Sequence, residues 1–173
     1  HSLVNDRDHL PQGNQLFVHT HIYKRIKKAI KRSPIDRDPA YRYSGLFFYL
    51  VPELVTHFTG LSISEYLNET FFEPLGTQTL GFNPLDRFSY DQIAPTEIDT
   101  FLRKEMIHGE VHDEGAILMG GISGNAGLFA NALDLSKIAH FLRRGGQSSD
   151  TTLLHPSTID VFTSYQFPNK NNR

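Results

Sequence analysis

The stretch Tyr43–Thr59, YSGLFFYLVPELVTHFT, carries the strongest structural signal in the sequence. Apolar residues recur in it at i, i+3, i+4 and i+7, the spacing of one face of an α-helix. The apolar positions are Tyr43, Leu46, Phe47, Leu50, Val51, Leu54, Val55 and Phe58. The pattern predicts a helix over the whole stretch, with this stripe buried. Pro52 lies on the opposite face and lacks a backbone donor, so a kink is expected there.

Two further helices are predicted on either side of this one. Gly60 fits a left-handed helix end, and Ser62-Ile63-Ser64-Glu65 is a capping box that predicts a second helix running towards Phe72. Upstream, helical spacing begins at Ile22 and should stop at Ser33-Pro34. Its other face is basic, with Lys24, Arg25, Lys27, Lys28, Lys31 and Arg32. A nucleic-acid interface is one interpretation, but no aromatic stacking platform is interleaved, which favours a solvated face.

The rest of the chain predicts short helices and little sheet. Residues 1–15 are expected to form loop, and the alternation in Gln15–Ile22 is typical of a short strand. Glu97–Ile107 fits either a helix or an extended segment. Asn131 should cap a helix that ends at Gly145, and a last short helix should follow Pro156. The expectation is a mainly α fold, with residues 1–173 forming a single partial domain.

Composition narrows the function classes. A net charge of -2 and a pI near 6.5 argue against general affinity for nucleic acid. The absence of cysteine excludes disulfides and thiolate metal sites. No apolar run reaches the roughly 18 to 20 residues that span a bilayer, so no membrane span is predicted in this segment. The chain starts at HSLVND without Met and stops at NKNNR, so both ends are expected to be cuts within a longer chain.

A second informative stretch is His108–Ala130, HGEVHDEGAILMGGISGNAGLFA, which combines titratable side chains with a glycine-rich apolar turn. We refer to it as the wall. His108, His112 and Asp113 are expected to hold the loop by hydrogen bonds. A zinc site on the two histidines is a weaker alternative, because Gly109 replaces the glutamate of His-Glu-x-x-His, so no metal or other cofactor is predicted. The glycines have no following Gly-Lys-Ser/Thr, which disfavours a phosphate loop.

No serine in the chain is followed three positions later by lysine. Tyr43-Ser44-Gly45 precedes the strong apolar stripe and could place a phenol in a cleft. A phenol is a useful proton shuttle only when nearby cations lower its pKa from about 10, and no such lysine can be identified in the sequence.

Three segments in order carry a family resemblance: YRYSGLFFYLVPELVTHFTGLSISEYLNETFFEPLG, IAPTEIDTFLRKEMIHGEVHDEGAILMGGISGNAGLF and LDLSKIAHFLRRGG. Together they resemble β-lactamase-related serine hydrolases, which include penicillin-binding proteins and class C β-lactamases. The segments look most similar to the domain fused to bacterial family-three β-N-acetylglucosaminidases. The resemblance implies the helical lobe of the β-lactamase/transpeptidase-like fold, without most of its α+β sheet lobe, and a periplasmic or secreted location.

The resemblance also implies residue roles. Tyr43 would be the catalytic tyrosine of a Tyr-x-Asn-like motif, and Ser44, Gly121 and Asn125 would contact substrate. Gly45 departs from the family pattern, which usually has a side-chain amide or carboxylate there, and Asn125 replaces a common histidine. The Ser-x-x-Lys and Lys/His-x-Gly motifs are absent, so they would belong to the remainder of the parent chain.

Three functions follow as hypotheses. The favoured one is a fragment of a serine hydrolase acting on peptidoglycan-like amides, β-lactams or esters, inactive alone and exposing an apolar face where the rest of the parent docks. The second is a non-catalytic binding or positioning module attached to a β-N-acetylglucosaminidase, which Gly45 and Asn125 favour. The third is a metal-dependent hydrolase built on His108 and His112.

Overall fold

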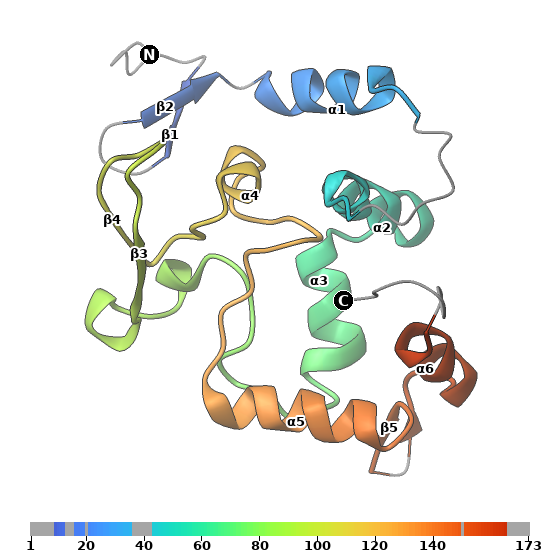
Figure 1. Cartoon of the computed structure of the whole chain (residues 1–173). Helices are drawn as coiled ribbons and strands as arrows, with labels where there is room; N and C mark the ends of the chain where they lie inside the picture. Colours follow the sequence, from blue (N-terminus) through green and yellow to red (C-terminus); the bar gives the residue numbers. More distant parts are fainter. Residues whose placement is uncertain (1–8, 13–15, 20, 36–42, 150, 166–173) are drawn as a thin grey trace.

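The computed structural model describes residues 9–12, 16–19, 21–35, 43–149 and 151–165. Helices dominate, as the sequence predicts, and the described strands form three separate two-stranded antiparallel sheets (Figure 1). In Figure 1, α3 (Ile63–Leu67) runs through the middle of the molecule, α1 (Ile22–Arg32) lies at one end and α5 (Ala132–Arg143) at the other. The short α4 (Glu114–Leu118) belongs to the wall.

The first sheet corrects the prediction of loop over residues 1–15. Strand β1 (His9–Gln12) pairs with β2 (Leu16–His19), while residues 1–8 and 13–15 lie outside the described part. The prediction of loop relied on the polar composition of this segment. Strand β1 is instead held by pairing with β2, which begins only a few residues later. Pro11 lacks a donor, which a two-stranded sheet tolerates because both of its strands are edges.

Helix α1 is confirmed, and its bounds are those that the sequence predicts. No residue of it is fully buried, and most of its basic side chains are exposed. It is tied to α2 (Val51–Thr59) through Glu53, which forms an ion pair with Lys27 and accepts a hydrogen bond from the Tyr23 hydroxyl at 3.0 Å. The pKa of Tyr23 is raised to about 12, mainly by burial and to a smaller extent by the hydrogen bond to Glu53.

The main helix begins later than predicted. Tyr43–Gly45 is not helical; a 3₁₀ helix, η1 (Leu46–Leu50), leads into α2, and Pro52 lies in the first turn of α2. The predicted kink is therefore wrong, because the first turn of an α-helix needs no backbone donor at that position. Gly60 ends α2 with a φ of 78°, as predicted.

The predicted burial of the apolar stripe is also wrong. Neither η1 nor α2 contains a buried residue, and the exposed side chains of the stripe include Leu46, Phe47, Leu54 and Phe58. The compact core lies elsewhere, in the wall, where Val111, Ala116 and Ile117 are buried and Leu102 and Ala126 pack on them. The described chain thus exposes an apolar face, which the sequence analysis also predicted.

Helix α3 starts with both bonds of the predicted capping box and continues as a π-helical turn, η2 (Asn68–Phe72). Within the described residues no single helix is long and apolar enough to cross a membrane. Leu46–Thr59 and Ile63–Phe72 pass that test of length and composition only as a pair, bent by 75°.

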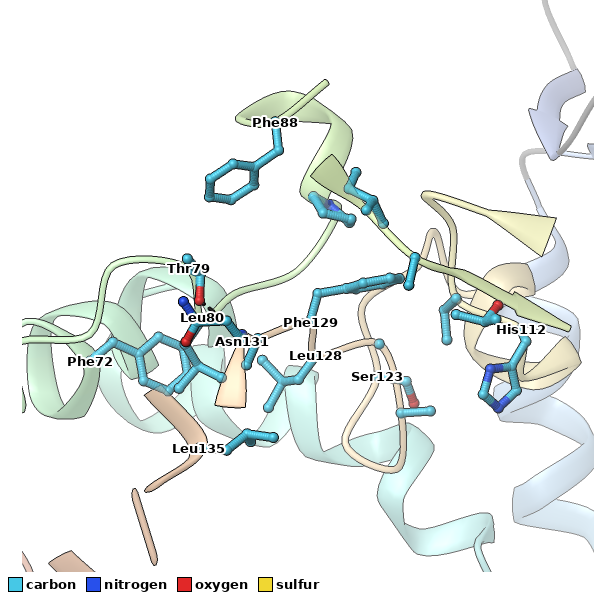
Figure 2. Close-up of a pocket in the computed structure, with 18 of the residues that line it drawn as sticks. Phe72, Thr79, Leu80, Phe88, His112, Ser123, Leu128, Phe129, Asn131 and Leu135 are labelled. Atoms are coloured by element: carbon cyan, nitrogen blue, oxygen red, sulfur yellow. Dashed lines mark hydrogen bonds between the residues drawn. The ribbon is translucent and has the colours of Figure 1, made fainter. Parts of the chain in front are cut away.

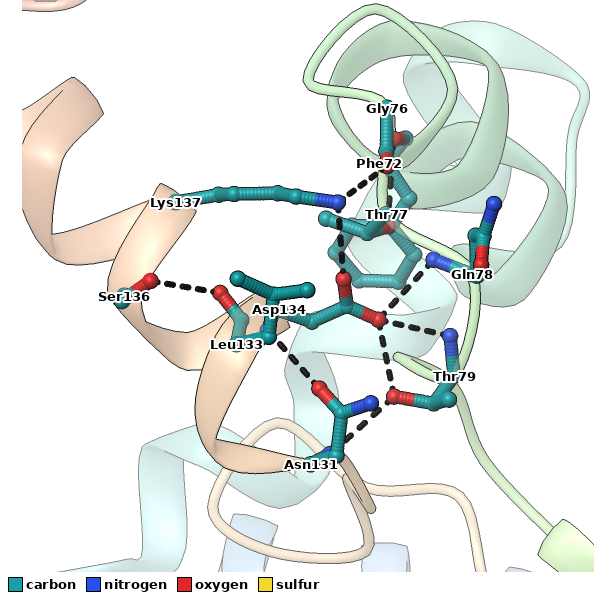
Figure 3. A network of polar contacts seen from close by, with 10 residues as sticks. All are labelled: Phe72, Gly76, Thr77, Gln78, Thr79, Asn131, Leu133, Asp134, Ser136 and Lys137. Carbon is teal, nitrogen blue, oxygen red and sulfur yellow. Dashed lines mark hydrogen bonds and ion pairs between the residues drawn. The ribbon is translucent and has the colours of Figure 1, made fainter.

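Asn131 caps α5 as predicted, and Asp134 joins that helix to the segment after η2 (Figure 3). The Asp134 carboxylate is 1% exposed and accepts hydrogen bonds from the Gln78 and Thr79 amides, at 2.9 and 2.6 Å, and from the Thr79 hydroxyl at 2.7 Å. Lys137 completes the ion pair at 3.0 Å. Burial alone would raise the pKa of Asp134, but these bonds together hold it well below its usual range.

The segment that the sequence left open, Glu97–Ile107, has strand at both ends and a loop over residues 99–105. Strand β3 (Pro95–Ile98) pairs with β4 (Met106–His108), and two short 3₁₀ turns, η3 (Pro84–Asp86) and η4 (Tyr90–Gln92), precede them. After α5, β5 (Gln147–Ser148) pairs with β6 (Thr151–Thr152), and α6 (Pro156–Thr163) follows Pro156 as predicted.

Candidate functional site

The wall packs against the η1–α2 junction through two glycines. The Gly124 amide donates to the Phe48 carbonyl at 3.2 Å, and a β-carbon at Gly124 would clash with that carbonyl and with Val51. A β-carbon at Gly115 would clash with the hydroxyl of Tyr49. These glycines therefore allow a close approach that any larger residue would block.

Tyr49 lies against the wall at Gly115. Its pKa is raised, first by burial and then by the charge of Asp113; a hydrogen bond from Asn125 opposes this rise, and Tyr43 adds a smaller increase. Sequence reasoning missed Tyr49, because it falls off the apolar stripe and carries no motif. No spacing in the sequence marks it, because Tyr43 and Tyr49 do not share a helix.

The Tyr43-Ser44-Gly45 tripeptide lies just before η1. Tyr43 is 81% exposed, and the Ser44 hydroxyl accepts a hydrogen bond from the Leu46 amide at 3.4 Å. Gly45 has a φ of -85°, and no atom lies within 4 Å of a β-carbon placed there. Neither backbone strain nor packing therefore requires glycine at this position.

Gly121 and Asn125 both belong to the glycine-rich turn of the wall. Gly121 has a φ of 82°, and a β-carbon there would clash with the Asn83 side chain, so its place is fixed by backbone geometry. Asn125 is exposed, and its Oδ1 accepts a hydrogen bond from the buried Ser123 hydroxyl at 2.6 Å.

A buried ion pair, which sequence reasoning missed, fixes the start of the wall. Arg103 and Asp99 are 2% and 3% exposed and lie 3.1 Å apart. Arg103 also donates to the Val111 and His112 carbonyls, at 2.8 and 2.7 Å. The pKa of Asp99 is held well below its usual range, first by a hydrogen bond from the Arg103 amide. Hydrogen bonds from the Leu102 and Phe101 amides and from the Arg103 guanidinium add to this effect, and together they outweigh burial, which would raise the pKa.

The three residues expected to hold the loop have separate contacts. His108 Nε2 lies 2.6 Å from the Ile93 carbonyl, and its ring meets Tyr90 edge to face. Asp113 caps α4 by accepting from the Ala116 amide at 2.7 Å. The His112 side chain is exposed, and its backbone carbonyl is held by Arg103. Among the described residues, no group of three or more His, Cys, Asp or Glu could hold a metal ion.

A cavity of about 810 Å³ lies between the wall, α5 and the η3–β3 segment (Figure 2). In Figure 2, His112 and Ser123 lie at one end and Phe72 and Leu135 at the other. Most of the lining is apolar, and Asn125 is among the few polar groups. The arrangement can bind an apolar group and donate hydrogen bonds at one end. The cavity offers hydroxyl, amide and imidazole groups, but with no Ser-x-x-Lys in the sequence it lacks the nucleophile and base that the resemblance implies.

Comparison with known proteins agrees with the resemblance at the level of the broad class. The chain is 36% identical over 149 residues to "Putative D-alanyl-D-alanine carboxypeptidase" of Escherichia coli (strain K12), covering 78% of this chain and 34% of the relative. A protein of the same name from Escherichia coli O157:H7 gives the same figures. A third, from Salmonella schwarzengrund (strain CVM19633), is 32% identical over 148 residues, with the same shares covered.

The chain spans about a third of the length of the curated relatives it matches. No family model matches the chain. The names of these relatives give no support to the expected fusion to a β-N-acetylglucosaminidase. They do support a relationship between this chain and penicillin-binding, serine-hydrolase-like proteins.

Proposed function

We propose that this chain is one lobe of a serine hydrolase that acts on peptidoglycan stem peptides ending in D-Ala-D-Ala. The similarity to carboxypeptidases of that specificity, over 78% of the chain, carries the proposal. Because peptidoglycan lies outside the cytoplasmic membrane, the proposed location is the periplasm or cell wall.

The proposal assigns the nucleophile to other polypeptide. A serine nucleophile needs an adjacent base, and none of the 173 residues forms a Ser-x-x-Lys pair. The relatives are about three times as long as the segment they share with this chain, so their length leaves room for that motif. In the proposal the remainder of the parent chain supplies serine and lysine, and this lobe has no activity alone.

The exposed apolar face also supports the proposal that this lobe works together with the remainder of the parent chain. Leu46, Phe47, Phe48, Leu54 and Phe58 are exposed on η1 and α2, although large apolar side chains clustered on consecutive turns normally mark a contact surface. We assign this surface to contact with the remainder of the parent chain. In the proposal that contact places the absent serine beside Tyr43, just before η1.

Tyr43 is the proposed proton relay. Its phenol is exposed at the start of η1, with Tyr49 and the wall beside it, so a docked nucleophile could reach it. In the acylation step, the serine hydroxyl would attack the penultimate peptide carbonyl, and Tyr43 would pass a proton towards the leaving D-alanine nitrogen. Water would then hydrolyse the acyl-enzyme.

The test uses the full-length parent protein, a fluorescent penicillin and an N-acylated peptide ending in D-Ala-D-Ala. We expect covalent labelling and release of D-alanine, and Tyr43→Phe should lower kcat by about 100-fold or more. Tyr165→Phe, at a tyrosine that is 80% exposed after α6, is the matched control and should change kcat less than about twofold. A parent protein that neither labels nor releases D-alanine would contradict the proposal.

A second candidate is a non-catalytic positioning module, including the expected attachment to a β-N-acetylglucosaminidase. Gly45 favours it, because a substrate-binding amide is missing where packing would admit one. This candidate predicts that the parent protein binds muropeptides reversibly, without covalent labelling, and that Tyr43→Phe leaves the affinity unchanged.

A further inference from the structure

The Asn125 amide is held in one orientation. Its Oδ1 accepts the hydrogen bond of Ser123, whose own side chain is 3% exposed and cannot turn to solvent. A serine hydroxyl has a single proton, and this one is used on Asn125. The oxygen of the Asn125 amide is therefore occupied from inside the glycine turn, and its nitrogen must point the other way.

Besides Ser123, the Asn125 amide interacts with the Tyr49 phenol. A hydrogen bond from Asn125 lowers the pKa of the Tyr49 phenol, against the larger effects of burial and of Asp113. An amide nitrogen carries two N–H groups, and the phenol oxygen can accept at most one of them, so at least one N–H remains. Asn125 is exposed and lines the 810 Å³ cavity, so this second N–H is accessible to a ligand.

We propose that Asn125 donates this N–H to an oxygen acceptor of the ligand, and that Ser123 is the positioning residue that fixes the amide for it. The inference rests on the proposed function and specifies the chemistry recognised at the wall. The partner is a carbonyl or carboxylate oxygen of the bound peptide. A ligand that presents only a donor at this point is disfavoured, because turning the amide oxygen outward would leave the buried Ser123 proton without its acceptor.

The experiment uses the full-length parent protein and N-acetyl-D-Ala-D-Ala. Asn125→Asp keeps the shape but replaces the donor by an acceptor, so we expect KM to rise about tenfold, with kcat within about threefold. Ser123→Ala releases the amide and should raise KM about threefold. The double variant should be no worse than Asn125→Asp alone, because Ser123 acts only through Asn125.

The matched control is Gln147→Glu. Gln147 is exposed on β5 and does not line the cavity, so this variant makes the same change from amide to carboxylate without removing the proposed donor. Its KM should stay within about twofold of the original. N-acetyl-D-Ala-D-Ala amide, in which an amide replaces the C-terminal carboxylate, distinguishes the two acceptors. If Asn125→Asp no longer raises KM for this ligand, the acceptor is the carboxylate. If Asn125→Asp still raises KM, the acceptor is the peptide carbonyl.

A second measurement keeps the inference separate from the proposed hydrolysis. In parent protein labelled with ¹⁵N at asparagine, the Asn125 side-chain amide signals, assigned through Asn125→Asp, should shift when the dipeptide is added. A shift without penicillin labelling or turnover would support the inference and overturn the hydrolase proposal. Turnover with an unchanged KM in Asn125→Asp would overturn the inference alone. No shift and no turnover would overturn both.

Discussion

The wall and the η1–α2 stripe lie against each other but are built in opposite ways. The wall and its supports bury charges: Asp99 and Arg103 are almost inaccessible, and α5, which follows the wall in the sequence, buries Asp134. The stripe is the most apolar run of the chain, yet none of its residues is buried. Polarity therefore does not predict burial in either region.

The difference follows from what each region needs in order to be stable. Among the described residues, every buried side-chain nitrogen and oxygen has a hydrogen-bond partner. The wall is therefore complete within this chain, since its buried charges are fully satisfied. The stripe needs apolar surface to pack on, and the described residues supply little of it. Four predictions test this contrast.

The largest effect is expected at Arg103. Arg103→Ala would leave the buried Asp99 carboxylate without its counter-ion and the Val111 and His112 carbonyls without a donor. We expect the free energy of unfolding of the chain to fall by about 3–5 kcal/mol in urea titrations. Arg143→Ala, at an exposed arginine in the last turn of α5, should cost less than about 1 kcal/mol. Equal losses in the two variants would show that the wall does not depend on this pair.

Asp134 should make stability depend on pH. Its folded-state pKa lies below the unfolded value of about 3.9, so its contribution is complete above that value and is lost as the pH falls towards the folded pKa. Asp134→Asn should cost about 2 kcal/mol at pH 7 and should lose less stability between pH 5 and pH 3 than the original chain. Asp160→Asn, on the exposed surface of α6, is the control. Parallel pH profiles for the original chain and Asp134→Asn would refute this role.

Two glycine substitutions test the docking of the wall. Gly115→Ala places a methyl group against the Tyr49 hydroxyl and should destabilise the chain by about 1–3 kcal/mol. Gly45→Ala meets no atom at a permitted φ, so it should be neutral or stabilise the chain by up to about 1 kcal/mol. Thermal unfolding measures both, and a tolerated Gly115→Ala would mean that Tyr49 does not pack there.

The smallest effect on stability is expected on the stripe. Phe58 is 79% exposed, so Phe58→Ala should change the free energy of unfolding by less than about 0.5 kcal/mol while lowering the binding of a hydrophobic dye. Phe141→Ala, at a phenylalanine that is 4% exposed, should cost about 3–5 kcal/mol. Unchanged dye binding in Phe58→Ala would show that this face is not the exposed apolar surface we describe.

Local signals in the sequence were reliable where the physics is local. The capping box at Ser62, the cap at Asn131 and the left-handed stop at Gly60 each depend on atoms within a few residues, and each is where the sequence placed it. Pro52 is the instructive failure. A proline lacks the backbone N–H donor, which kinks a helix when the proline lies in its interior but has no cost in the first turn. The outcome at Pro52 therefore depends on where the helix starts, and α2 starts at Val51.

The site was harder to predict than the helices. The sequence picked out the wall and the tripeptide at Tyr43, but it missed Tyr49, which meets Gly115, and it missed Arg103. Arg103 donates to carbonyls eight and nine residues further along a folded loop. Nothing in the spacing of Asp99 and Arg103 distinguishes a buried pair from an ordinary exposed i, i+4 pair. Their burial is a property of the fold.

The sequence by itself determined the helical content, the caps and stops of the helices, the lack of a Ser-x-x-Lys motif and the identity of the wall, because each depends on neighbouring residues. Tertiary structure alone decided which groups are buried: the Asp99–Arg103 pair inside, the apolar stripe outside, and Tyr49 against Gly115. Burial depends on which distant segments cover a residue, and residue type sets only its cost.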